Sequence, residues 1–228
     1  MKKLFTVLAI VFFGANSQAQ KIVTDTINDL ILVEGDSIMF TLDEVIILSK
    51  LKFKDNKEKR YYYWYWKKVH NAYPYAKLAA ERLIQLNEQL KKIPSKGKRR
   101  RHIKKMQKYM EGEFTEKLKS MTKTEGRILI KLIHRQTGLT TFDLIKEYRS
   151  GWKAFWYNTT ANLFKLNLKD EYHPESNPID FLIEDILMRS FTQGRLEKQP
   201  ARLAIDYFEL APLYKNMDIV AVINERNK

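Results

Sequence analysis

The fold of this chain is decided by residues 72–98, AYPYAKLAAERLIQLNEQLKKIPSKGK, and by the similar pattern that follows them. Apolar side chains recur at spacings of three and four residues on both sides of the breaker cluster at 94–98, which is typical of two helices joined by a turn. These positions are Ala72, Ala76, Ala79, Leu83, Leu86, Leu90 and Ile93, then Ile103, Met106, Met110, Phe114, Leu118 and Met121. We predict a long antiparallel helical hairpin with facing apolar seams. Pro74 should kink the first helix or start it afresh.

Capping signals predict several shorter helices after the hairpin. An N-terminal cap is a Ser, Thr, Asp or Asn, strengthened by an acid three residues on or by Pro at the first helical position. The three signals are Thr122 with Glu125, Thr140 with Asp143, and Asn177 with Pro178. They open helices expected to end near residues 138, 149 and 191, and a further helix is expected over 152–166. Beyond Gly194, residues 202–210 favour a helix, whereas 219–223 suit a strand or a helix.

Short apolar runs come before the helices. Residues 30–33 and 37–40 flank the turn signal Glu34-Gly35-Asp36, and a third run covers 45–48. The expected fold class is therefore mainly α (α+β): a long antiparallel helical hairpin plus several shorter helices, with a small N-terminal β-hairpin or three-stranded piece. The expected organisation is a signal peptide at 1–19, strands and a charged connector at 20–60, a helical domain at 61–193 and a C-terminal extension at 194–228.

The first nineteen residues have the layout of a secretory signal peptide. Lys2 and Lys3 precede the apolar run 4–13, and Ser17 and Ala19 are the small residues before a cleavage point. The apolar run is shorter than the ~20 residues that span a bilayer. The chain has no Cys, which excludes disulfides, thiolate chemistry and lipoprotein anchoring. We expect a soluble exported protein, periplasmic or extracellular.

The positive charge of the chain is concentrated in one segment. The formal net charge of the 228 residues is +14, and residues 50–108 hold 20 Lys and Arg against 4 Asp and Glu. A strongly basic segment predicts a partner of negative charge. Because the protein is expected to be exported, we predict an anionic envelope component, such as a lipid headgroup, lipopolysaccharide or a wall polymer, and no nucleic acid. The sequence leaves a protein partner open.

Several segments resemble one exported bacterial family. They are 73–76, YPYA; 126–138, GRILIKLIHRQTG; 153–157, KAFWY; and 168–174, LKDEYHP. Together they are similar to the exported Bacteroidota family catalogued as domain of unknown function 4294, over roughly residues 30–190. Met39 stands where proline is usual in that family, and His134 where an acid is common. The resemblance implies an exported, mostly helical protein, and it supplies no reaction and no catalytic residue.

The turn of the predicted hairpin is strongly basic. Residues 91–108 contain ten Lys and Arg and no acid. Five of them are the leading ligand-binding candidates: Arg99, Arg100, Arg101, Lys104 and Lys105. Each Lys or Arg close to an anionic membrane contributes ~1 kcal/mol of binding free energy. The alternative interpretation is a solvated tip that keeps a long hairpin in solution.

A second cationic group lies on the helix expected after Thr122. Arg127, Lys131 and Arg135 recur every four residues and share one face of this otherwise apolar helix. One hypothesis is a pocket for an anionic ligand, because Arg matches carboxylates and phosphates, with Trp152 and Trp156 as its walls. The other, commoner in proteins, is pairing with acids, since unpaired buried cations are costly. The acids considered are Glu147, Glu171, Glu184 and Asp185.

Residues 61–66, YYYWYW, place aromatic side chains on every side of a helix. Such a run suits a sugar-stacking surface, a membrane-interface belt or a dimer contact, or it packs in the core where the strands meet the helices.

Two groups of acids offer weaker candidates for paired carboxylates in glycoside hydrolysis. These groups are Glu111, Glu113 and Glu116, and Glu175, Asp180, Glu184 and Asp185.

Motifs for metal binding and nucleophilic catalysis are absent from the sequence. The four His are isolated, no Ser lies in a GxSxG elbow, and no glycine loop for phosphate is present. We expect no cofactor, no metal and no catalytic residue. The leading hypothesis is a non-enzymatic binding module for an anionic envelope component. The alternatives are an envelope glycan-acting hydrolase near Arg127, Lys131 and Arg135, and a structural subunit of an envelope assembly that uses residues 61–66.

Overall fold

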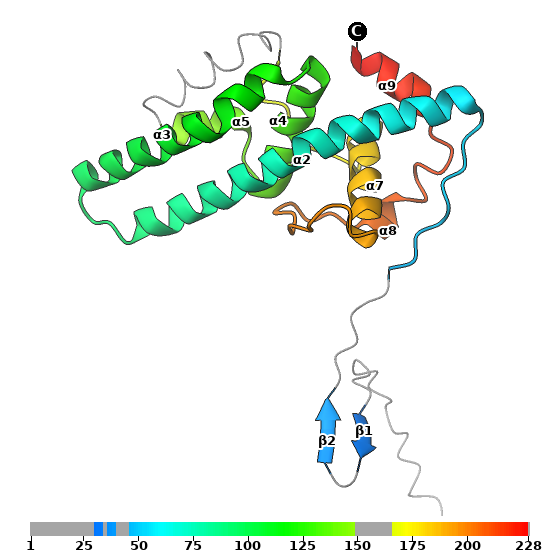
Figure 1. The fold of residues 1–228 in the computed structure, drawn as a ribbon, viewed down its shortest axis with the longest axis horizontal. Helices are drawn as coiled ribbons and strands as arrows, with labels where there is room; N and C mark the ends of the chain where they lie inside the picture. The colour runs from blue at the N-terminus through cyan, green and yellow to red at the C-terminus, as the bar shows by residue number, and fades with distance from the viewer. Residues whose placement is uncertain (1–29, 34–35, 40–45, 149–165, 228) are drawn as a thin grey trace, which may run out of the picture. The chain divides into compact units, whose positions relative to one another are not determined.

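The structure is a computed structural model and describes residues 30–33, 36–39, 46–148 and 166–227. The chain divides into two compact units, Met1–Ile47 and Leu48–Lys228, which are considered separately. The described residues are mainly helical (Figure 1), which confirms the expected fold class at that level. The signal-peptide region, and the helix expected over 152–166 except for its last residue, lie outside the described residues.

The first unit contains two short antiparallel strands, β1 (Leu30–Val33) and β2 (Asp36–Met39). Leu30 pairs with Met39 and Val33 pairs with Asp36 at the two ends of the ladder. Residues 46–48, the described part of the expected third strand, have no regular secondary structure. A strand requires a neighbour for its backbone N–H and C=O groups, and apolar β-branched residues alone do not provide one.

The longest element of the second unit is α2, Asn56–Lys91. The helix begins inside the expected charged connector because Asp55 caps it: the Asp55 carboxylate accepts the backbone N–H of Glu58 at 2.7 Å. Pro74 lies within α2, so the helix continues through it and does not start afresh. Pro74 is exposed, and on that side water can satisfy the carbonyl that loses its helical partner.

Helix α3, Lys96–Ser120, folds back along the C-terminal half of α2 after a short connection. Three contacts set the antiparallel register: Gln89 with His102, Arg82 with Tyr109, and Tyr75 with Phe114. Leu83 and Leu86 of α2 and Met110, Phe114 and Leu118 of α3 are buried in the seam. The hairpin therefore has the facing apolar seams that the spacing predicts.

Three further helices begin at the expected caps. Helix α4 (Lys123–Thr137) has a complete capping box at Thr122 and Glu125 and ends at Gly138, with φ of 73°. Helix α5 (Thr141–Tyr148) follows the hydrogen-bonded pair Thr140 and Asp143. Helix α7 (Pro178–Thr192) is capped by the side chain of Asn177. Local cap chemistry was sufficient to place all three starts.

The C-terminal region is less regular than the sequence suggests. Of the helix expected over 202–210, only α8, Tyr207–Leu210, is helical, and Asp206 caps it. The segment 219–223, for which strand and helix were both open, belongs to helix α9, Ile219–Asn227. Helix α9 contacts both α2 and α7.

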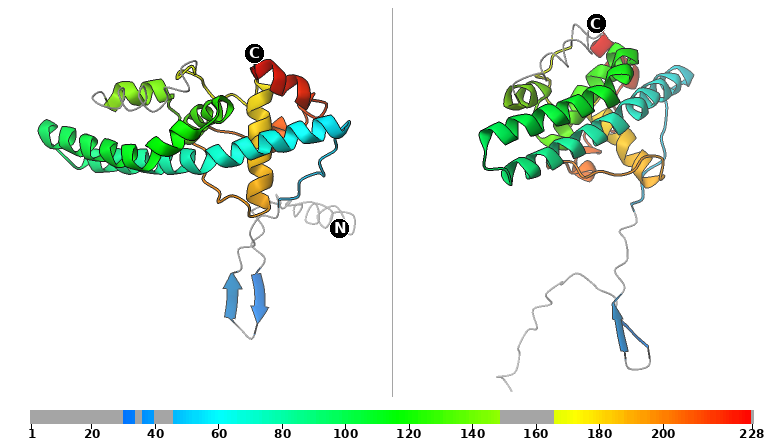
Figure 2. Two further views of the ribbon diagram at one scale, coloured as in Figure 1. Left: turned by 45° about the horizontal axis from the view of Figure 1, so that its top comes forward. Right: turned by 60° about the vertical axis from the view of Figure 1, so that its left-hand side comes forward.

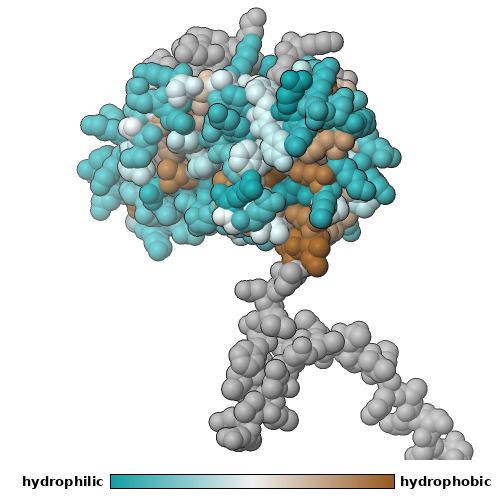
Figure 3. All heavy atoms as spheres, turned by 45° about the vertical axis from the view of Figure 1, so that its right-hand side comes forward, coloured by the Kyte–Doolittle hydropathy of each residue, from teal (hydrophilic) through white to brown (hydrophobic). Residues whose placement is uncertain are grey.

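Helix α2 is the central element of the second unit, and α3, α4, α7 and α9 all contact it. Figures 1 and 2 show α3 beside one half of α2 and α7, α8 and α9 near its N-terminal end. The core is continuous along α2, from Val69 and Ala76 to Leu132 of α4 and Ile183 and Ile186 of α7. Figure 3 shows a largely hydrophilic surface with scattered apolar patches.

Candidate functional site

The connection between α2 and α3 forms a basic tip, defined here as the ten cations of residues 91–108. All ten side chains are exposed. They are Lys91, Lys92, Lys96, Lys98, Arg99, Arg100, Arg101, Lys104, Lys105 and Lys108. Within the described residues, none of them forms an ion pair with an acid. The structure therefore brings the five leading candidates together on one exposed end of the hairpin.

The start of α3 adds to the positive potential of the basic tip. Ser95 occupies the N-cap position without a side-chain cap hydrogen bond, and the first turn contains no acid. A helix N-terminus carries a partial positive charge, so Lys96 and Lys98 in the first turn oppose the helix dipole. Arg99 adds a further cation here, and its Nε donates a hydrogen bond to the carbonyl of Ile93 across the turn. An anion at this end would relieve the repulsion.

Two cations of the α4 stripe are paired with acids of α7. Lys131 Nζ lies 2.7 Å from Asp180 Oδ2, and Arg135 makes two hydrogen bonds of 2.8 and 2.6 Å to the Glu184 carboxylate. Both cations are buried. Burial alone would lower the pKa of Arg135, and the hydrogen bonds and charge of Glu184 raise it above its ordinary value. Of the two hypotheses for the cationic stripe, an anionic-ligand pocket or pairing with acids, the structure has the second for Lys131 and Arg135.

A buried hydrogen-bond network surrounds these pairs. The Tyr172 hydroxyl donates to Glu184 at 2.7 Å, and the Tyr172 backbone N–H donates to Nδ1 of His134 at 2.9 Å. Lys131 also donates to the carbonyl of Glu171 at 2.8 Å. The network joins α4, α7 and the segment before α7, and it therefore holds these three parts of the fold in a fixed arrangement.

Three candidates of this stripe and its expected pocket remain. Arg127 lies one turn before Lys131 and is half-buried. Trp152 and Trp156, the expected pocket walls, lie outside the described residues.

The aromatic run at 61–66 forms the first part of α2 and points in several directions, as its spacing predicts. Tyr62 and Tyr65 are buried, whereas Tyr63 and Trp64 are exposed by 47% and 42%. Trp66 stacks on His70 with ring centroids 3.6 Å apart. Four of the six side chains, with Tyr61 and Trp66 packed against the core beside Tyr62 and Tyr65, therefore contribute to the core or to its edge. Tyr63 with Trp64 forms a small exposed aromatic surface.

The acids considered for glycoside hydrolysis are largely engaged in other contacts. Asp180 and Glu184 pair with Lys131 and Arg135. Asp185 accepts from Arg189 Nε at 2.9 Å. A general acid or base needs a carboxyl group that can reach the substrate, whereas these three carboxylates are buried and hydrogen-bonded to side chains of the fold.

A comparison with family models gives one match. The model described as Domain of unknown function (DUF4294) matches residues 36–189. The chain belongs to this family. No curated protein and no solved structure matches the chain.

The DUF4294 match contains most of the features described above. It includes the helical hairpin with its basic tip, and both buried ion pairs between α4 and α7. It ends within α7, so α8 and α9 lie beyond it. The family resemblance inferred from the motifs of residues 73–174 is therefore confirmed.

The four His of this DUF4294 protein take part in hydrogen bonds of the fold. His70 contacts Ser190 Oγ at 2.7 Å and His173 bridges Glu171 and Glu175, both at 2.7 Å. Among the described residues no group of three or more His, Asp or Glu could hold a metal ion. In the same part of the chain, no helix combines the length and the apolar character needed to cross a bilayer.

Sequence reasoning missed one feature, a cavity at the N-terminal end of α2. Its volume is about 730 Å³, and it is lined from α2, α7 and α8, from residues 49–54 and from residues 211–219. Tyr62 and Asp185 were noted in the sequence, but Tyr207 and Tyr214 were not. No single sequence motif indicates the cavity, because the residues that line it come from segments more than a hundred residues apart.

Proposed function

We propose that the protein is a non-enzymatic binding module for an anionic component of the cell envelope, and that the basic tip is its binding surface. The observation that carries the proposal is the exposure of ten cations at one end of the hairpin without an acid partner among the described residues. A solvated surface in proteins usually mixes both signs of charge. A tip of one sign is suited to a partner of the opposite sign.

The expected binding energy is considerable although each contact is weak. Each Lys or Arg near an anionic membrane surface contributes ~1 kcal/mol, so five cations in contact contribute about 5 kcal/mol. Salt at ~0.15 M screens charges beyond ~8 Å, so the tip must touch its partner and binding must weaken as the salt concentration rises. Lipid headgroups, lipopolysaccharide and anionic wall polymers all present the required negative charge.

The cellular location is part of the same proposal. The layout of residues 1–19 supports export by a signal peptide, and the family resemblance supports an origin in Bacteroidota. Outside the cytoplasm an anionic envelope surface is more abundant than nucleic acid. The short hairpin of β1 and β2 would then follow the cleavage point as the N-terminal part of the mature protein.

The test is co-sedimentation of the purified protein with isolated cell envelopes at low and at high salt. The key variant replaces Arg99, Arg100, Arg101, Lys104 and Lys105 with Gln. The control variant replaces five exposed cations away from the tip with Gln: Lys57, Lys59, Arg60, Lys67 and Lys123. Binding that is lost in the tip variant and at high salt, and kept in the control, supports the proposal. Equal binding by both variants contradicts it.

A further inference from the structure

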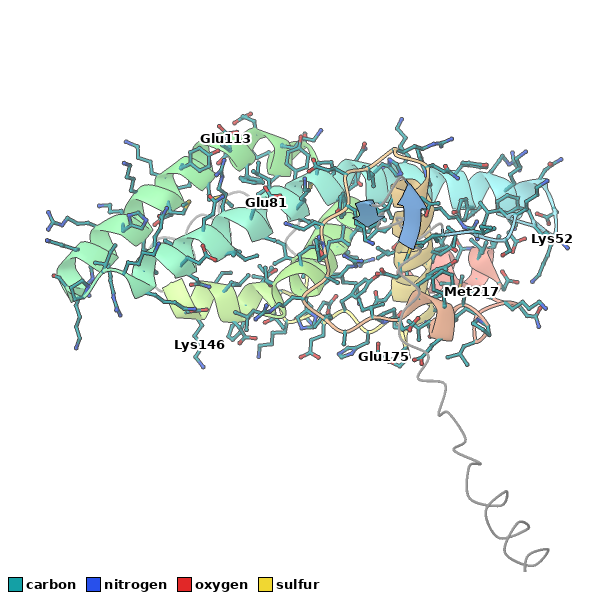
Figure 4. The ribbon with its side chains drawn as sticks, turned by 90° about the horizontal axis from the view of Figure 1, so that it is seen from below. Lys52, Glu81, Glu113, Lys146, Glu175 and Met217 are labelled. Atoms are coloured by element: carbon teal, nitrogen blue, oxygen red, sulfur yellow. The ribbon has the colours of Figure 1, made fainter. Side chains whose placement is uncertain are left out.

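The cavity at the N-terminal end of α2 is remote from the basic tip. From Tyr62 in its wall to Lys91 at the tip, α2 runs for 29 residues, or about 44 Å at ~1.5 Å per residue. Figure 4 shows Lys52 and Met217, which both line the cavity, at the end of α2 opposite to the hairpin turn. The volume of about 730 Å³ lies within the ~300–1,000 Å³ usual for small-molecule sites.

Apolar and aromatic side chains form the walls of the cavity. Phe181 stacks on Tyr214, with ring centroids 4.4 Å apart and an interplanar angle of 16°. Tyr207 lies parallel to Phe181 on the same wall, with centroids 6.0 Å apart. Leu51 and Met217 contribute further apolar surface from the segments on either side. Such walls favour an apolar group of a ligand.

The polar groups at the floor of the cavity satisfy one another. Asp185 accepts hydrogen bonds from Tyr207 at 2.6 Å, from Arg189 at 2.9 Å and from Tyr62 at 3.5 Å. Burial first, and then the charge of Asp185, raise the pKa of both tyrosines, so they stay protonated as donors. Arg189 also donates to the carbonyl of Ser49 at 2.8 Å and fixes the segment that borders the cavity.

The second acid of the lining is compensated as well. Glu58 accepts the backbone N–H of Lys54 at 2.6 Å. It lies in the first turn of α2, where the helix dipole stabilises a negative charge. Neither acid therefore offers a strong site for a cationic ligand.

The rim of the cavity is positively charged. Lys50, Lys52 and Lys215 are exposed there, and within the described ranges none of them pairs with an acid. Lys54 is also on the rim and lies 3.6 Å from Asp218. The cavity thus combines apolar walls, a floor whose polar groups are satisfied and an excess of cations at its mouth.

We propose that this cavity binds a single-chain anionic amphiphile, with its apolar chain against Phe181 and Tyr214 and its acidic headgroup among Lys50, Lys52 and Lys215. A neutral sugar fits less well, because it needs polar wall groups with free hydrogen-bonding capacity and those at the floor are used by one another. A cationic amphiphile is repelled at the rim. The site is separate from the basic tip and does not depend on the function proposed for it.

Isothermal titration calorimetry of the purified protein tests the proposal with three probes of equal chain length, each below its critical micelle concentration. Dodecanoate and dodecyl phosphate are expected to bind saturably at one site, and dodecyltrimethylammonium is not. The tighter of the two anions distinguishes a fatty acid from a phosphate-headed lipid as the natural source. Ala211→Trp, which fills the cavity from its wall, should abolish binding.

Charge variants make the test independent of the cavity-filling variant. Replacing Lys50, Lys52 and Lys215 with Gln should weaken dodecanoate binding at least tenfold, and these exposed positions leave the core intact. Replacing Lys57, Lys59 and Lys67 with Gln removes the same charge elsewhere and should leave binding unchanged, as should the five-residue tip variant. Binding of dodecyltrimethylammonium as tight as that of dodecanoate overturns the proposal. So does a lack of dodecanoate binding, or equal binding by both lysine variants.

Discussion

Lys131 and Asp180 form an ion pair between α4 and α7 that is almost fully shielded from water, with 4% and 0% of their side chains exposed. Asp180 also accepts the backbone N–H of His173 at 3.1 Å, so one carboxylate oxygen joins three segments of the fold. A buried pair of this kind is costly to break, because the remaining charge has no partner and little water. Its main role is therefore to fix the packing of α4 on α7.

Asp180→Asn should lower the free energy of unfolding by about 3–5 kcal/mol, because it leaves Lys131 buried without a counter-charge. Urea denaturation followed by circular dichroism measures the loss. Glu116→Gln is the matched control, since it breaks the exposed pair of Glu116 with Lys119 and should cost less than ~1 kcal/mol. Similar costs for the two variants would show that Lys131 reaches water or another acid.

Arg135→Lys should destabilise the protein although it keeps the charge. Arg135 holds Glu184 with two parallel hydrogen bonds of 2.8 and 2.6 Å and reaches Gln136 with a third nitrogen at 2.7 Å. A lysine ammonium cannot reproduce this fork, and a hydrogen bond to a charged group contributes about 1.5–3 kcal/mol. We expect a loss of that size in the same urea experiment. Arg60→Lys, at an exposed position, should change nothing measurable.

His134 and His173 should affect the pH dependence of stability in opposite directions. Burial lowers the pKa of His134, while the hydrogen bonds of His173 to Glu171 and Glu175 raise the pKa of His173. The contribution of His134 is therefore full above the ordinary pKa of about 6.5 and is lost as the pH falls below it. That of His173 is full below about 6.5 and is lost as the pH rises through its raised pKa.

The measurement is the urea midpoint at pH 7.5 and at pH 5.5. His134→Asn, which keeps an acceptor for the Tyr172 N–H, should lose less stability on acidification than the wild type. His173→Asn should lose more, by a smaller margin because His173 is half-exposed. A steeper acid loss in His134→Asn than in the wild type would contradict the assigned direction of its pKa.

Local signals in the sequence were sufficient for most of the helical framework. The capping box of Thr122, the left-handed Gly138 and the Asn177 cap each depend on a few neighbouring residues, and the structure has all three. In the C-terminal region Asp206 and Asp218 cap the short helices that follow them, but α9 has no strong amphipathic period and is held by contacts with α2 and α7. Short apolar segments of this kind are assigned by packing and not by pattern.

The side-chain partners of the candidate residues were harder to predict. The sequence offers Glu184 as a partner for the cationic stripe but does not single out Asp180. Each of these acids lies 49 residues from the cation that it binds. The sequence shows which residues can pair, whereas the crossing of α4 and α7 decides which of them meet. The same reason hides the cavity at the N-terminal end of α2, whose walls meet only in the folded chain.

Gly138→Ala should destabilise the protein more than Gly194→Ala. Both glycines have positive φ, 73° and 65°, so both substitutions incur the left-handed penalty of about 1–2 kcal/mol. Only at Gly138 would the added Cβ meet another side chain, the Cγ of Arg202 at 3.3 Å, whereas nothing lies within 4 Å at Gly194. Equal melting temperatures for the two variants would mean that Arg202 moves aside without cost.

Lys98→Glu should stabilise α3 and weaken binding at the basic tip. Position 98 is the third residue of α3 after the N-cap Ser95, so Glu there would complete a capping box and favour the helix dipole. We expect a gain of about 0.5–2 kcal/mol in the free energy of unfolding. If the tip binds anions, the same change should reduce binding to vesicles that contain phosphatidylglycerol.

Lys104→Glu separates the two effects of this substitution. It makes the same change of charge on the tip, but Lys104 lies beyond the first turn of α3 and cannot cap it. It should therefore weaken vesicle binding to a similar extent without the gain in stability. A stabilised Lys98→Glu variant that still binds the vesicles as tightly as the wild type would mean that the uncapped, cationic start of α3 does not serve anion binding. The expected result for Lys98→Glu is a higher free energy of unfolding together with weaker vesicle binding. That result would show that Lys98 provides positive charge at the basic tip at the expense of helix capping.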